Sequence, residues 1–136
     1  MSAFTAFCWA NRGGDRFRFG VRDWAQAYAI QLLPKLSPPH QQRLESALAA
    51  CGQAGRDSGW PEAAQAASSM KGNYIKGGFP DGDGFWPAHI AQQLARTDID
   101  AALDVAWAMR CATGITNEQL LADLQDAMSK HTGRGL

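Results

Sequence analysis

The chain has few of the residues from which large sheets are built. Its 136 residues include 2 valines and 5 isoleucines, against 24 alanines and 11 leucines. β-Branched residues favour strands, whereas alanine and leucine lose little side-chain entropy in a helix. This composition excludes a large β-sandwich or parallel sheet and predicts a mainly helical protein. A chain of this length is typical of one domain with one core.

The sequence also lacks an excess of charge, a cysteine framework and a long apolar run. Basic and acidic residues number 13 each, so no net field favours nucleic acid or a membrane surface. Cys8, Cys51 and Cys111 are odd in number and far apart, which fits free thiols in a reducing compartment. No stretch approaches the roughly 18–20 apolar residues of a membrane span, and residues 1–10 lack the basic region of a secretion signal. We expect a cytoplasmic protein without a membrane partner.

Residues 2–22 predict a β-hairpin. The segment RFRFGVR at residues 16–22 alternates between basic and apolar side chains. A period of two places its phenylalanines and valine on one face of a strand and its arginines on the other. The turn-forming residues 11–15 (NRGGD) precede this strand and are typical of a hairpin loop. A helix over residues 2–10 is the alternative that the sequence leaves open.

Residues 23–71 and 87–131 have helical patterning. Their apolar residues recur at spacings of three and four, and helix start signals precede them. Ser37 stands before two prolines, and Thr116 has a glutamine three residues later, as in a capping box. We predict about six short helices, packed with the hairpin into one globular domain over residues 1–136. The fold class is mainly α, or α+β with a minor sheet.

Residues 72–86 connect the two helical ranges and are rich in glycine and aromatic residues. Connections of this length are usually functional or disordered. Aromatic side chains bury large areas and anchor a loop, which argues against disorder. We therefore expect an ordered loop whose aromatic residues contact a partner. These residues are Tyr74, Phe79, Phe85 and Trp86.

No catalytic, nucleotide-binding or cofactor motif of high specificity occurs in the sequence. The string DGDG at residues 81–84 resembles the middle of a calcium loop, but the first and the bidentate ligand positions hold a phenylalanine and an isoleucine. Asp81, Asp83 and His89 are a ligand set that suits iron or manganese. They lack the spacing that fixes ligands on one helix face. We expect no cofactor, and a small metal-dependent enzyme is retained as an alternative.

Four arginines near the N-terminus are the best candidates for a recognition surface: Arg12, Arg16, Arg18 and Arg22. A guanidinium group binds carboxylate or phosphate through two hydrogen bonds, and interleaved aromatic rings suit base stacking. The surface would then meet the acidic face of a protein partner or a nucleic acid. Alternatively, the arginines only keep an edge strand soluble.

Charge is distributed unevenly along the chain. Residues 1–76 contain nine basic and five acidic residues, a net charge of +4, whereas residues 77–136 contain four and eight, a net charge of −4. Asp98, Asp100 and Asp104 are expected on or beside one helix, with Thr97 or Asp98 as its candidate cap, and form an acidic face that suits a basic groove. Alternatively, the two halves neutralise each other within the fold or in a head-to-tail homodimer.

The lack of a site motif favours a binding protein over an enzyme. We expect a non-enzymatic protein-binding module that modulates or inhibits a larger assembly, such as a nucleoprotein complex. Small inhibitors encoded by phages and mobile elements, anti-CRISPR proteins among them, are likewise short, single-domain and motif-poor; this analogy rests on no shared residues. The contact surface would use the arginine strand, the loop aromatics and the acidic helix face, because aromatic residues and arginine dominate binding hot spots. Nucleic-acid binding through the hairpin is the second hypothesis.

Overall fold

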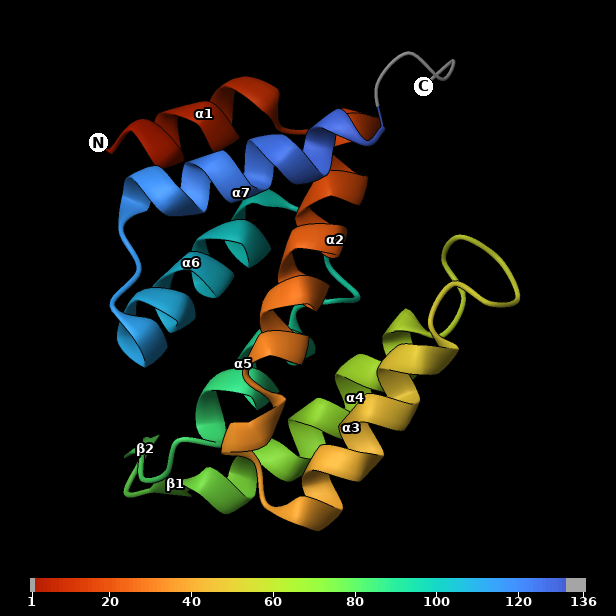
Figure 1. Ribbon diagram of the computed structural model, residues 1–136, viewed down its shortest axis with the longest axis vertical. Coiled ribbons are helices and arrows are strands. Elements are labelled where there is room, and N and C mark those ends of the chain that lie inside the picture. Colours follow the sequence, from red (N-terminus) through yellow and green to blue (C-terminus); the bar gives the residue numbers. More distant parts are fainter. Residues whose placement is uncertain (1, 132–136) are drawn as a thin grey trace.

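The protein is a helical domain with one two-stranded sheet, as seen in a computed structural model that describes residues 2–131 (Figure 1). Its elements follow the chain as α1 (Ala3–Asn11), α2 (Asp15–Gln31), the 3₁₀ helix η1 (Leu33–Lys35), α3 (Pro38–Ala50), α4 (Trp60–Lys71), the 3₁₀ helix η2 (Gly72–Tyr74), β1 (Ile75–Lys76), β2 (Phe79–Pro80), α5 (Phe85–Gln92), α6 (Ile99–Thr113) and α7 (Asn117–Ser129). The mainly helical prediction is confirmed. None of the described helices has the length and apolarity that a bilayer crossing needs.

The N-terminal hairpin predicted for residues 2–22 is wrong. α1 and α2 occupy this segment, so the alternative of an N-terminal helix is the one observed. Ser2 caps α1 by accepting a hydrogen bond from the backbone N–H of Thr5 (3.2 Å). The alternation in residues 16–22 misleads because α2 is covered on more than one side. Phe17 and Val21 lie one helical turn apart and face the core, whereas Phe19 is buried elsewhere on the helix.

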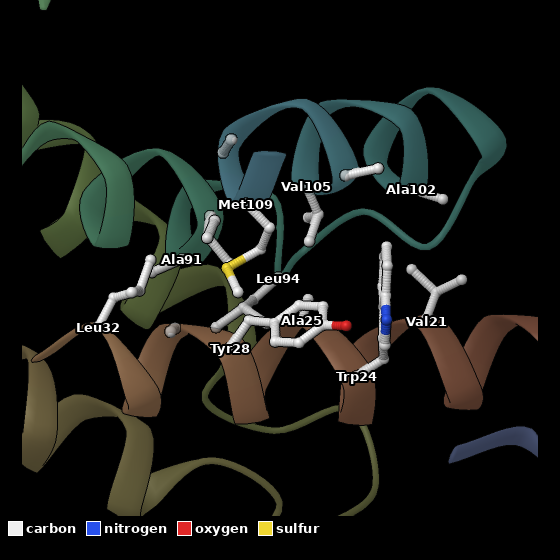
Figure 2. Packing of buried hydrophobic residues seen from close by; sticks show 14 of the residues in the cluster. Val21, Trp24, Ala25, Tyr28, Leu32, Ala91, Leu94, Ala102, Val105 and Met109 are labelled. Atoms are coloured by element: carbon white, nitrogen blue, oxygen red, sulfur yellow. The ribbon is translucent and has the colours of Figure 1, made fainter. Parts of the chain in front are cut away.

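α2 is the central helix of the molecule. Figure 1 shows it running from the end where α1 and α7 lie to the end where α3 begins. It contacts α7 and also packs against α5 and α6. Figure 2 shows Trp24 and Tyr28 projecting from α2 beside Val105 and Met109 of α6. One hydrophobic cluster therefore joins α2 to α5 and α6 and also to α7.

Alanine allows the helices to approach closely. Ala63 and Ala67 on α4, and Ala88 and Ala91 on α5, are fully buried, and these two helices contact each other. A methyl side chain fills little space and loses no rotamer entropy on burial. The alanine-rich composition thus serves both helix formation and close packing.

The start signals identified in the sequence act as caps at two helices. The side chain of Asp98 accepts from the N–H of Ala101 (2.8 Å), and that of Thr116 accepts from the N–H of Gln119 (3.1 Å). Ser37 occupies the N-cap position of α3 but makes no capping hydrogen bond through its side chain. Local polar chemistry therefore determined these helix starts.

The sheet lies in the connection between α4 and α5, within residues 72–86. β1 and β2 pair in antiparallel fashion, with Ile75 opposite Pro80 and Lys76 opposite Phe79. Gly77 and Gly78 have φ values of 60° and 87°, and a two-residue turn with positive φ at both positions favours glycine. α5 then begins at Phe85, two residues before the predicted start of the second helical range.

Candidate functional site

Two tryptophans join α5 to α6. Trp86 and Trp107 pack edge to face, with ring centroids 5.3 Å apart. Phe85 lies behind them, with its ring centroid 4.9 Å from that of Trp86 and 6.5 Å from that of Trp107. Phe85 is buried, whereas 41% of the surface of Trp107 is exposed. An indole is thus presented to solvent and supported by other rings.

A lysine and a histidine lie beside these rings. Lys71, the last residue of α4, donates from Nζ to Nδ1 of His89 (3.0 Å) and to Oε1 of Gln92 (2.8 Å). Because an ammonium group only donates, this contact places the His89 ring proton on Nε2. Nε2 is buried and has no hydrogen-bond partner among residues 2–131. The imidazole stacks on Phe85 (centroids 5.4 Å apart, planes at 16°) and meets the edge of Trp107 (5.4 Å).

The surroundings keep His89 neutral over a wider pH range. Burial lowers the pKa of His89, and the charge of Lys71 lowers it further, while the carboxylate of Asp104 on α6 acts in the opposite direction. Burial also lowers the pKa of Lys71, again opposed by Asp104. We call Trp86, Trp107, Lys71, His89 and Asp104 the tryptophan surface. It combines an exposed indole with one basic and one acidic group.

The four loop aromatics predicted to bind a partner do not form one exposed patch. Phe85 is buried and Trp86 is half-buried. The phenol oxygen of Tyr74 lies 3.2 Å from Oγ of Ser37 and 2.6 Å from Nδ1 of His40, so this side chain attaches the loop to the start of α3. Phe79 alone of the four projects into solvent, with 75% of its surface exposed beside the hairpin turn.

The four N-terminal arginines do not share a face. Arg12 lies over the ring of Trp9, and Arg16 is exposed at the start of α2. Arg22 is buried, contrary to its predicted role in an exposed recognition face. The expected strand would have aligned these side chains, whereas a helix distributes them around its axis.

Arg18 and Arg22 instead approach Arg56, which lies in the segment between α3 and α4. We call these three residues the arginine cluster. Arg22 donates from Nη1 to Oδ1 of Asp57 (2.9 Å) and from Nε to the carbonyl of Leu94 (3.2 Å). The hydrogen bond from Arg22 is the largest cause of the lowered pKa of Asp57, and the charges of all three arginines contribute.

The predicted acidic face is divided. Asp98 lies 3.3 Å and Asp100 3.9 Å from Nη2 of Arg96, so both are paired near the start of α6. Asp104 is half-buried, acts on Lys71 and His89, and belongs to the tryptophan surface. The three aspartates therefore serve different parts of the molecule.

The predicted metal ligands are not brought together. Within residues 2–131, no three histidine, cysteine, aspartate or glutamate side chains lie close enough to hold a metal ion. Asp81 and Asp83 are exposed, while Nδ1 of His89 faces Lys71. The arrangement offers no basis for a metal-dependent site at these three residues.

No protein-family model, curated protein or solved structure matches the chain.

Sequence reasoning did not single out two residues of these surfaces. Trp107 is exposed beside the buried stripe of α6 that includes Ala101, Val105 and Met109. That stripe would have placed Trp107 outside. No sequence pattern marks Arg56 in the same way, because only folding brings it close to Arg22, which is distant in the sequence.

Proposed function

We propose that this protein is a protein-binding module that modulates or inhibits a larger assembly, and that it docks through the tryptophan surface. The observation that carries the proposal is the exposure of Trp107, 41%, on a helix whose neighbouring rings support it. Removing apolar area from water contributes about 25 cal/mol per Å². Tryptophan is also one of the residue types that dominate binding hot spots.

The surroundings of Trp107 favour binding because they restrict its movement beforehand. Rings of Trp86, Phe85 and His89 contact the indole, so docking would freeze few additional rotamers. Lys71 and Asp104 place one charge of each sign beside the apolar centre. An apolar centre with a mixed-charge rim suits a protein partner, whereas protein surfaces that bind nucleic acid carry an excess of basic residues.

Substitution of Trp107 tests the proposal. Purified Trp107→Ala and the wild-type protein would be immobilised and exposed to a lysate of the cells in which the gene occurs. Trp9→Ala is the matched control, because Trp9 is 44% exposed on the separate helix α1. We expect the wild type and Trp9→Ala to retain one stoichiometric protein, and Trp107→Ala to bind it about 30-fold more weakly, as for a hot spot of about 2 kcal/mol.

Two outcomes would count against the proposal. One is that Trp107→Ala binds the partner as tightly as the wild type does. The other is that Trp107→Ala and Trp9→Ala lose the same amount of binding. Circular dichroism of each variant checks that a loss of binding does not come from unfolding.

A further inference from the structure

Three guanidinium groups from two segments converge at Asp57. Arg18 and Arg22 come from α2, and Arg56 comes from the segment between α3 and α4. The pKa of Asp57 is lowered first by the hydrogen bond from Arg22 and then by the charges of Arg22, Arg18 and Arg56. A single carboxylate thus lies in the field of three cations.

The cluster contains more positive than negative charge. Asp57 bonds to Arg22, and Asp15 lies 3.3 Å from Arg18 in an exposed pair of the kind that contributes little. Among residues 2–131, no carboxylate lies within ion-pair distance of Arg56. Arg56 therefore has guanidinium donors available for an additional anion.

Arg18 and Arg56 are held in place by a shared ring. Their guanidinium carbons lie 5.5 Å and 4.3 Å from the centroid of Phe19, which is 8% exposed. A guanidinium group that packs its face on a ring keeps its in-plane N–H groups for hydrogen bonding.

The backbone that carries Arg56 is fixed as well. Its carbonyl accepts a hydrogen bond from Nε1 of Trp60 (2.9 Å), and Asp57 is bound by Arg22. The N–H of Gly52 closes the base of this segment on the carbonyl of Ser58 (2.8 Å). The cost of ordering the arginine for a ligand is therefore reduced before binding.

We propose that Arg18 and Arg56 together bind the phosphoryl group of a phosphate-bearing ligand, while Arg22 and Asp57 hold the segment that carries Arg56. A phosphate monoester presents three acceptor oxygens and a charge of about −1.5 to −2, which suits two guanidinium groups. The rings of Phe19 and Trp60 are buried and already contact arginines, so they offer no platform for a base. The site therefore recognises the phosphoryl group itself.

Calorimetric titration with inorganic phosphate and with phosphoserine tests this site at low and at physiological salt. We expect both ligands to bind, and Arg56→Gln to weaken binding at least tenfold. Arg43→Gln, which changes an exposed arginine on α3, should bind like the wild type. Asp57→Asn should bind several-fold more tightly, because it removes the competing negative charge and keeps an oxygen for Arg22.

Several results would overturn the proposal. They are equal phosphate binding by Arg56→Gln and the wild type, no gain in Asp57→Asn, and binding of a single-stranded oligonucleotide without binding of either small phosphate. Phosphoserine binding without inorganic phosphate would identify the ester as the required source of the phosphoryl group. Trp107→Ala should leave phosphate binding unchanged, so this test is independent of the proposed docking surface.

Discussion

Arg22 illustrates how its surroundings decide what a residue does. Its side chain is 8% exposed, lies over the ring of Trp60 and donates to both Leu94 and Asp57. The sequence predicted a recognition role from its charge. Burial instead makes it a link between α2 and two distant segments, because a buried guanidinium group needs its donors satisfied.

His89 leads to a prediction of pH dependence at the residue scale. Its pKa is lowered from 6.5 in the folded state by burial and by Lys71, while Asp104 partly opposes the shift. As the pH falls below about 6.5, the unfolded chain takes up a proton that the folded ring excludes, so the free energy of unfolding decreases. The loss should continue until the pH passes below the folded pKa.

Urea unfolding between pH 7.5 and 5 measures this effect. His89→Gln has no titrating group there, so its free energy of unfolding should fall less over this range than that of the wild type. If the free energy of unfolding fell equally with pH in the two proteins, His89 would not contribute to the pH dependence. His131→Gln is a comparison that removes a different histidine, whose Nε2 lies 2.7 Å from Oδ2 of Asp23 on α2.

At the scale of elements, the packing of α2 on α7 depends on one glycine. A Cβ atom at Gly20 would lie 2.3 Å from Cγ of Met128 and 3.1 Å from its Cα. The side chain of Met128 is flexible, but its backbone is part of α7. Two helices can therefore approach here only without a side chain on α2.

Gly20→Ala should consequently destabilise the protein. Alanine favours a helix over glycine by about 1 kcal/mol, whereas overpacking of a core costs about 1–3 kcal/mol. We expect a net loss of up to about 2 kcal/mol in the free energy of unfolding, from the balance of these two terms. Chemical denaturation measures it.

Gly72→Ala is the control for this substitution. Gly72 has negative φ, and an added Cβ would meet none of the described residues within 4 Å. A stability equal to or above that of the wild type is expected there. If both alanine variants were equally stable, close packing at Gly20 would not limit the approach of α7.

At the scale of the whole molecule, most ion pairs form within one half of the chain. Arg18–Asp15 and Arg22–Asp57 lie within residues 1–76, whereas the pairs of Arg96 and Lys130 lie within residues 77–136. In the part of the chain that the structure describes, only His131–Asp23 crosses between these ranges. The basic and acidic halves therefore do not neutralise each other mainly through direct ion pairs.

Because α2 is shared, the bundle should unfold as one unit. The buried cluster extends from α1 to α7, and α2 contacts both α7 and α5. Gly20→Ala perturbs the α2–α7 contact, yet it should lower hydrogen-exchange protection at Ala63 and Ala67 of α4 by the same free energy as in α7. Unchanged protection in α4 would indicate two parts that open separately.

Local signals were the predictable part of this structure. The caps at Asp98 and Thr116 need only residues near them in sequence. The hairpin turn at Gly77 and Gly78 was not predicted, because residues 72–86 were interpreted as a loop and the hairpin was placed at residues 2–22. The segment at residues 16–22 was misassigned because seven alternating residues fit a strand as well as a helix covered on two sides. The candidate surfaces were only partly predictable, since Arg56 and Trp107 acquire their roles from distant partners.

The sequence by itself determined a helical protein, because an excess of alanine and leucine and a shortage of β-branched residues act at each position separately. Only the tertiary structure decided which charges and rings are available to a ligand. Arg22 is buried and Arg56 is not, while Phe85 is covered and Trp107 projects. Exposure depends on which helices cover a residue, and that packing is a property of the whole chain.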